Sequence, residues 1–193
     1  MTKIKNNLKG FTIIELLVVV AIIGLLSTMT VIAVKIARQK AKIAKSQHDI
    51  DTLYTAISTL ANDTDQWPGH QVANVINLVE DSTEICGSDI NSNNCATNLS
   101  DLSSGIIGDD TVTPYIGWQG VYMKKIPIDP WNHEYFFDTH YMVDIDNNPC
   151  NGAGVCSSAV VIGSYGPDGE GKPDGTSAGS YGSDDIIKMI MRN

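Results

Sequence analysis

The sequence predicts an α+β fold in which a long N-terminal helix packs on a small antiparallel β-sheet. Three observations predict it. An apolar run of 24 residues follows a short basic segment, an amphipathic stripe continues that run, and β-rich runs separated by turn residues occupy the C-terminal third. At 193 residues, the chain has room for a leader, one membrane span and one modest domain.

The N-terminal segment combines a basic leader with a membrane-length apolar run. Residues 1–10 carry three lysines, and Glu15 is the only charge between Phe11 and Val34. As a helix these 24 residues would reach about 36 Å, enough to cross a hydrocarbon core of about 30 Å. A secretory signal has a shorter apolar region with a small-residue cleavage site after it, whereas here the only processing-like position precedes the run, at Gly10–Phe11. Residues 11–34 are therefore predicted to span a membrane, and an ordinary uncleaved anchor is the alternative.

The helix is predicted to continue beyond the membrane as an amphipathic segment over residues 35–61. Isoleucine recurs every seven residues from Ile36 to Ile57, and no proline or glycine interrupts residues 25–66. Polar residues at the intervening positions disfavour a coiled coil, so packing against the protein's own sheet is expected. Residues 62–65, followed by Pro68–Gly69, are predicted to end the helix.

The remaining part, residues 62–193, is predicted to be a globular head. A short helix is expected around residues 72–79, and residues 81–110 have the composition of a loop. Strands are predicted at 135–137, 140–143 and 159–162, which together would form a three-stranded antiparallel sheet. Residues 186–191 are expected to form either a last strand or a helical turn.

Four cysteines lie in two polar loops of this head and predict an oxidising compartment. The simplest pairing joins neighbours along the chain, Cys86 with Cys95 and Cys150 with Cys156. A four-cysteine zinc site is the rival, although the gaps of eight and five residues exceed the usual spacing of zinc ligands.

The charge distribution is strongly acidic outside the helix. The net charge is −9, and removing the three leader lysines would make it −12. Residues 51–193 carry 20 acidic and 5 basic side chains, a net of −15, which opposes nonspecific binding of nucleic acid. The basic cluster of residues 35–45 is the one plausible contact for a polyanion or lipid headgroups, unless it is only a solvated helix face. More basic residues follow the span than precede it, so a positive-inside count favours a cytoplasmic head.

Residues 10–24 (GFTIIELLVVVAIIG) resemble the class III leader and N-terminal helix of type IV pilins and their secretion-system relatives, and the resemblance covers residues 9–34. It implies a type IV pilin-like fold, cleavage after Gly10 by a prepilin peptidase, and methylation of the new Phe11 amine. It also places the leader in the cytoplasm, against the positive-inside count. Glu15 then occupies the family's glutamate position, and the hypothesis is that it pairs with the Phe11 amine of an adjacent protomer during assembly. The alternative is that Glu15 merely lies at the lipid headgroups.

Two further segments are similar to the major pseudopilin of type II secretion. Residues 117–135 are similar to the segment that carries its Asp-Pro-Trp-Gly-x-Pro-Tyr signature, with Asn132 in place of Gly and Glu134 in place of Pro. Residues 163–169 and 182–186 resemble its calcium loop. Carried over by position, Asp168 and Asp185 are the best candidate ligands, and the other candidates are Ser164, Asp174 and Asp184. A solvated acidic turn is the alternative.

Together these features predict a structural subunit rather than an enzyme, because the motif-like stretches of the head lack the residues that catalysis requires. The expected protein is a single-pass pseudopilin of the bacterial inner membrane, with its head in the periplasm. Its implied partners are other copies in a helical filament, other pseudopilins, prepilin peptidase, the inner-membrane assembly platform and membrane lipid. A type IV pilus subunit for adhesion, motility or DNA uptake is the second hypothesis, and a membrane-anchored hydrolase is the third.

Overall fold

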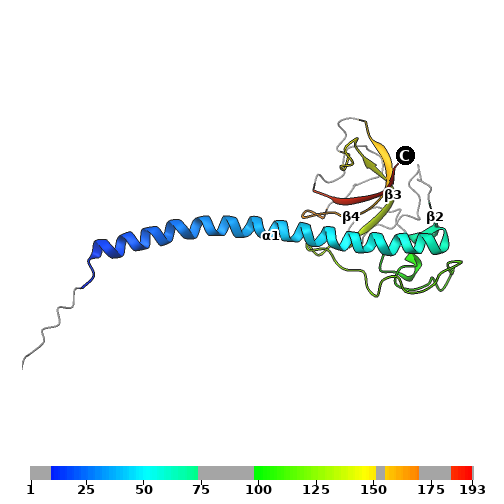
Figure 1. The fold of residues 1–193 in the computed structure, drawn as a ribbon, viewed down its shortest axis with the longest axis horizontal. Coiled ribbons are helices and arrows are strands. Elements are labelled where there is room, and N and C mark those ends of the chain that lie inside the picture. Colours follow the sequence, from blue (N-terminus) through cyan, green and yellow to red (C-terminus); the bar gives the residue numbers. More distant parts are fainter. Residues whose placement is uncertain (1–9, 74–97, 151–154, 170–183, 193) are drawn as a thin grey trace, which may run out of the picture. The chain divides into compact units, whose positions relative to one another are not determined.

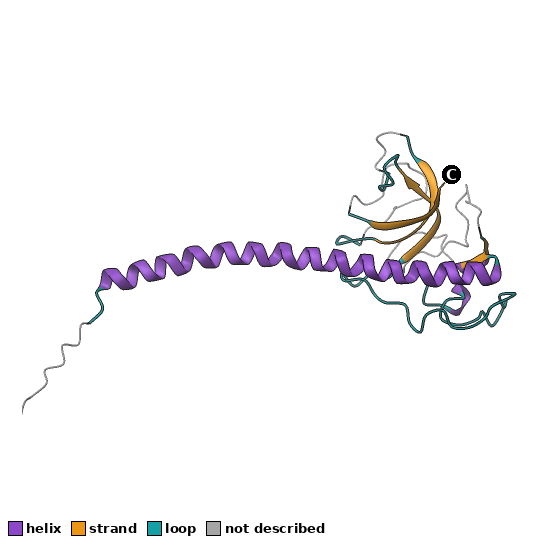
Figure 2. Cartoon of the chain, viewed as in Figure 1, coloured by secondary structure: helices purple, strands orange, loops and turns teal. Residues whose placement is uncertain are grey.

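The computed structural model describes residues 10–73, 98–150, 155–169 and 184–192, apart from the side chains of residues 28–30 and 140. The chain divides into two compact units, residues 1–41 and 42–193, and each is described by itself below. Figure 1 follows the chain from the long helix through the strands of the second unit, and Figure 2 distinguishes helices, strands and loops.

The helix α1 (Ile13–Thr64) has 52 residues, and its bounds lie within three residues of the predicted 11–61. In its last turn, the Thr64 hydroxyl donates a hydrogen bond to the Leu60 carbonyl at 2.8 Å. Asp65 follows in the left-handed region, with φ of 56°, and the chain leaves the helix axis there. The polar run at 62–65 therefore ends the helix as expected.

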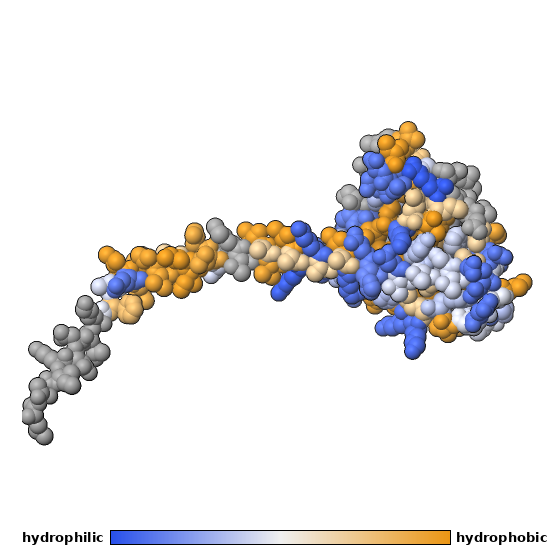
Figure 3. Space-filling view, in the orientation of Figure 1, coloured by the Kyte–Doolittle hydropathy of each residue, from blue (hydrophilic) through white to orange (hydrophobic). Residues whose placement is uncertain are grey.

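The first unit is dominated by the apolar half of α1. Its large apolar side chains are exposed within the unit, from Phe11 at 89% to Val34 at 42%. The most apolar stretch has a mean hydropathy of 2.7, so α1 meets the length and composition of a membrane-crossing helix. Figure 3 shows the hydrophobic side chains running along this part of the helix.

The second unit contains the predicted three-stranded antiparallel sheet, in the order β3 (Phe136–Val143), β4 (Ser157–Ser164) and β5 (Ile186–Arg192). Phe137 pairs with Ile162, and Gly163 pairs with Ile187. The assignment of residues to the three strands was predicted wrongly in one respect. Apart from Tyr135, which precedes β3, the β-rich runs at 135–137 and 140–143 form one strand, because β3 continues through an irregularity between Asp138 and Tyr141. The third strand is instead β5, which resolves the choice left open for residues 186–191.

The sheet packs on the second half of α1, as expected. The core contains four positions of the helical stripe, together with residues of β3 and β4 and of the segment before them: Ile50, Leu53, Ile57, Leu60, Tyr135, Phe137, Val160 and Ile162. A second buried cluster covers the opposite face of the sheet, and Phe136, Tyr141 and Val161 belong to it. Ile36 and Ile43 remain exposed at 52% and 39%, so the seven-residue repeat enters the core only from Ile50 onward.

The segment after α1 forms a small hairpin that the sequence did not predict. Strands β1 (Gln66–Trp67) and β2 (Gln71–Val72) flank the 3₁₀ turn η1 (Pro68–His70). Val72, where a short helix was expected to begin, lies in β2, and residues 74–79 of that prediction lie outside the described residues. A second 3₁₀ turn, η2 (Leu102–Ser104), interrupts the predicted loop.

Candidate functional site

The N-terminal end of α1 carries a reciprocal cap between Thr12 and Glu15. The Thr12 backbone N–H and hydroxyl both donate to Glu15 Oε2, at 2.8 and 2.7 Å, and the Glu15 N–H donates to Thr12 Oγ1 at 3.3 Å. This is the arrangement of a capping box, which satisfies N–H groups that have no partner inside the helix. It explains why α1 begins at Ile13 rather than at Phe11.

The cap leaves the predicted processing bond outside the helix. Gly10 and Phe11 are exposed, and neither belongs to α1. A peptidase must bind its substrate in an extended form, so a bond two residues before a fixed helix start is well placed for cleavage. Glu15 is bound within its own chain here. Its predicted pairing with the Phe11 amine of another protomer belongs to an assembly and stays a prediction.

The Asp-Pro-Trp segment forms a turn that Asp129 organises. Asp129 is 4% exposed, and its Oδ1 accepts hydrogen bonds from the backbone N–H groups of Trp131 at 2.9 Å and His133 at 2.7 Å. Asn132 has φ of 77°, a left-handed backbone conformation that asparagine tolerates. The turn is therefore compatible with asparagine at this position.

The same carboxylate joins this turn to the predicted calcium segment. The buried Ser164 hydroxyl donates to Asp129 Oδ2 at 2.6 Å. The His133 ring lies against the next loop, because a Cβ on Gly169 would come within 2.5 Å of His133 Nε2. Contacts between residues 35 positions apart thus join the two segments into one structural unit, and sequence reasoning missed both Asp129 and His133. The Asp-Pro dipeptide signals a turn, but nothing in the sequence reveals that Ser164 completes it.

The predicted metal ligands are distributed over two places. Asp168 and Asp184 lie together, since the Asp168 N–H donates to Asp184 Oδ2 at 3.3 Å. Asp185 is buried, and its Oδ2 accepts a hydrogen bond from the Tyr141 hydroxyl at 2.6 Å. The Ser164 hydroxyl is bound to Asp129, and Asp174 lies outside the described residues.

This arrangement fits calcium in part. All the candidate donors are oxygens, which calcium prefers, and the backbone of Asp168 lies beside the Asp184 carboxylate. The Ser164 hydroxyl fits poorly because its hydrogen bond is already directed into the core. No group of three or more His, Cys, Asp or Glu side chains that could hold a metal occurs among residues 10–73, 98–150, 155–169 and 184–192. Further ligands would therefore have to come from backbone oxygens or from residues 170–183.

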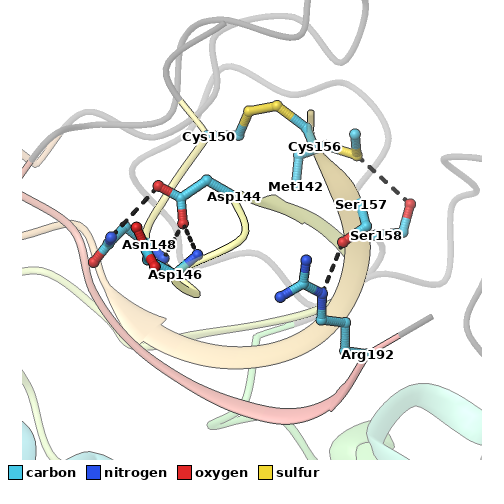
Figure 4. The surroundings of a disulfide bond; sticks show 9 residues. All are labelled: Met142, Asp144, Asp146, Asn148, Cys150, Cys156, Ser157, Ser158 and Arg192. Carbon is cyan, nitrogen blue, oxygen red and sulfur yellow. Dashed lines mark hydrogen bonds between the residues drawn. A yellow bond between two sulfur atoms is a disulfide. The ribbon is translucent and has the colours of Figure 1, made fainter. Parts of the chain in front are cut away.

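The predicted disulfide between Cys150 and Cys156 is present, and it closes the connection between β3 and β4 (Figure 4). Arg192 lies beside it. The Arg192 guanidinium donates to Ser157 Oγ at 2.9 Å and to Asn147 Oδ1 at 2.8 Å. The C-terminal strand thus holds both sides of this loop. The predicted partners Cys86 and Cys95 lie outside the described residues.

A second polar cluster surrounds His70. The His70 ring stacks on Tyr115 with ring centres 3.8 Å apart, and its Nε2 lies 3.2 Å from Asp110 Oδ2. The Val112 N–H, followed by the Thr113 hydroxyl, holds the pKa of Asp110 at about 2. The cluster joins the β1–β2 hairpin to the loop after η2, a contact between residues 40 apart in sequence.

Comparison with known proteins identifies one segment. Residues 5–31 match the prokaryotic N-terminal methylation motif. The matched range contains the predicted cleavage position, the Thr12–Glu15 cap and most of the apolar run. No curated protein matches the sequence.

Proposed function

We propose that this chain is a structural subunit of the type II secretion pseudopilus. The premise is that the methylation motif and the long apolar helix support a type IV pilin-like protein. The motif implies processing by prepilin peptidase and assembly into filaments. In this proposal the mature chain begins at Phe11, is held in the bacterial inner membrane by α1 and carries its head in the periplasm. Its role is mechanical rather than catalytic.

The observation that carries the proposal is the start of α1. The Gly10–Phe11 bond is exposed and non-helical, and a capping box begins the helix immediately after it. Cleavage there would release a charged amine within one turn of the Glu15 carboxylate. A charged group buried in apolar surroundings is costly, so pairing between neighbouring chains would favour assembly.

The secretion role rests on the head. The Asp129 turn and the glycine-rich segment at Ser164 resemble the two signatures of the major pseudopilin, and their direct hydrogen bond supports treating them as one feature. The Cys150–Cys156 disulfide is the observation that favours the second candidate, a type IV pilus subunit, because cysteine-bearing loops are more typical of pilins.

Mass spectrometry of the native protein tests the shared part of both candidates. It should find N-methylphenylalanine from position 11 as the first residue, and a mature chain that still begins at Met1 would contradict it. Deleting the gene then separates the candidates. Loss of protein export with surface pili intact supports the pseudopilus, whereas loss of surface filaments with normal export supports the pilus.

Calcium binding near Asp168 and Asp184 is a separate part of the proposal. Bound calcium would neutralise these carboxylates and stabilise the head by mass action. The melting temperature should rise with millimolar calcium and fall with chelator. Asp168→Asn should remove most of the response, whereas Asp146→Asn, in a different exposed loop, should leave it intact. A melting temperature that ignores calcium would refute this part alone.

A further inference from the structure

The basic segment that follows the apolar half of α1 is divided by the structure into two sets of cations. Two of them have partners inside the second unit. Lys45 Nζ forms an ion pair with Asp49 Oδ2 at 2.5 Å, and Lys42 Nζ lies 5.6 Å from the centre of the Trp131 ring. The first interaction joins two successive turns of α1, and the second joins α1 to the Asp-Pro-Trp turn of the head.

The other three cations belong to the first unit and are free of such partners. Lys35, Arg38 and Lys40 are exposed, and no ion pair or side-chain hydrogen bond joins them to other residues in the part of the chain that the structure describes. The nearest carboxylates in the sequence are Glu15 and Asp49, 20 residues before Lys35 and 9 residues after Lys40. Among the described residues, these three cations therefore have no compensating carboxylate.

The position of these three cations relative to a bilayer follows from the geometry of the helix. Counted from Ile13 at 1.5 Å per residue, Lys35 lies about 33 Å along α1, Arg38 about 37 Å and Lys40 about 40 Å. A bilayer has a hydrocarbon core of about 30 Å and a total thickness of about 40–45 Å with its headgroups. A helix tilted by about 20° loses only a few per cent of this depth. Lys35 and Arg38 therefore fall in the headgroup layer, and Lys40 falls at its outer edge.

Their distribution around the helix indicates what kind of partner fits. At about 100° per residue, Lys35 and Arg38 lie about 60° apart, whereas Lys40 lies about 140° from Lys35 on the other side. One face of a protein partner could not contact all three. A headgroup layer surrounds the helix and supplies phosphates on every side.

We infer that Lys35 and Arg38, with Lys40 at the edge, form a binding site for anionic phospholipid headgroups. The ammonium and guanidinium groups would bind lipid phosphates and set the depth of the helix. This inference rests on the membrane anchoring in the proposed function and not on the role in secretion.

Native mass spectrometry of the full-length protein tests it. The protein in detergent is mixed with equal amounts of phosphatidylglycerol and phosphatidylcholine, and the bound lipids are counted. We expect the wild type to retain phosphatidylglycerol in preference by about fivefold or more, which corresponds to one surface cation. Lys35→Gln/Arg38→Gln should bring the ratio close to one. Lys124→Gln/Lys125→Gln removes the same charge from exposed positions of the head and should leave the preference unchanged.

Three outcomes would overturn the inference. The first is a wild type without preference at low salt. The second is an equal loss in both double variants, which would indicate a net-charge effect. The third is a variant that keeps its lipid preference but no longer forms the oligomers of the wild type, which would assign these cations to a second copy of the chain. Circular dichroism checks that the variants remain helical, and carbonate extraction of membranes tests the anchoring independently.

Discussion

At the scale of single residues, Asp129 joins the Asp-Pro-Trp turn to the start of the predicted calcium segment. Its buried carboxylate accepts hydrogen bonds from Trp131, His133 and Ser164. Asp129→Ala would leave these three donors without their acceptor, and each buried unsatisfied group costs about 1–3 kcal/mol. Because the turn is partly exposed to water, we expect a loss of about 3 kcal/mol and a fall in melting temperature of about 10 °C.

Thermal unfolding of the protein in detergent micelles checks this prediction. Asp146→Ala is the matched control, because Asp146 is exposed and contributes its backbone N–H rather than its side chain to the Asp144 loop. A variant of Asp129 that melts with the wild type would show that the turn is maintained by packing alone.

The second prediction concerns Asp110 and the stability of the protein in acid. Its pKa lies at about 2, below its ordinary value of 3.8, because the Val112 N–H and the Thr113 hydroxyl stabilise the carboxylate. A group with a lowered folded-state pKa stabilises the protein above its unfolded pKa, and that contribution is lost as the pH falls through the folded value. The melting temperature should therefore fall between about pH 4 and pH 2.

Asp110→Asn should flatten this part of the pH profile, since the amide does not titrate. Exposed Asp101, a neighbouring carboxylate in the same loop region, provides the comparison as Asp101→Asn. Profiles of equal slope for wild type and Asp110→Asn would contradict the assignment.

At the scale of elements, periodic segments were predictable and irregular ones were not. The helix from Ile13 to Thr64 could be predicted within three residues because its apolar run, its stripe and its polar end agree. Strand β3 was divided wrongly because Asp138 and Thr139 have the polarity of a turn, whereas the chain passes them as a β-irregularity. The β1–β2 hairpin was missed because strands of two residues carry no periodic pattern.

The contact between the end of α1 and the loop before the Asp129 turn depends on Gly117. Its φ is 88°, and a Cβ there would come within 2.5 Å of the Asp63 carbonyl oxygen. Gly117→Ala should lower the free energy of unfolding by about 2–3 kcal/mol, measured by urea titration. Gly120→Ala is a sharp control. Its φ of 149° also lies in the range that favours glycine, but its Cβ would meet nothing within 4 Å, so this variant measures a backbone cost without a clash.

The disulfide between Cys150 and Cys156 stabilises the β3–β4 connection. Closing a loop of this length restricts the unfolded chain and contributes about 2 kcal/mol. Cys150→Ser/Cys156→Ser should melt several degrees below the wild type. The melting temperature of Cys86→Ser/Cys95→Ser tests separately whether the other predicted pair contributes to stability. Should the Cys150 variant melt with the wild type, the Arg192 contacts to Ser157 and Asn147 would be sufficient to hold this loop.

At the scale of the whole molecule, the chain combines a helix that can be stable only in lipid or beside other helices with a head that has its own core. The apolar half of α1 has no buried face within its unit. The stripe from Ile50 to Leu60, in contrast, is buried in the core of the head. The sequence predicted this division because the two halves differ in periodicity. It could not predict which contacts the apolar half makes, since an all-round apolar surface fits lipid and neighbouring helices equally well.

Glu15 is where these two environments can be distinguished by experiment. In a single chain its carboxylate is satisfied by Thr12, so Glu15→Ala should cost only the value of a helix cap, about 1 kcal/mol, and the precursor should still accumulate in the membrane. In a filament the loss is larger, because a Phe11 amine of a neighbouring chain would remain charged in an apolar bundle. Co-expression of tagged Glu15→Ala with wild type should therefore give normal membrane levels but incorporation into filaments reduced roughly tenfold or more. Thr12→Val removes the two hydrogen bonds of the Thr12 hydroxyl, keeps the backbone N–H bond and the carboxylate, and should still be incorporated. If the Glu15 variant entered filaments at the rate of the wild type, the carboxylate would serve only as a cap, and the assembly hypothesis would fail even if every other part of the fold held.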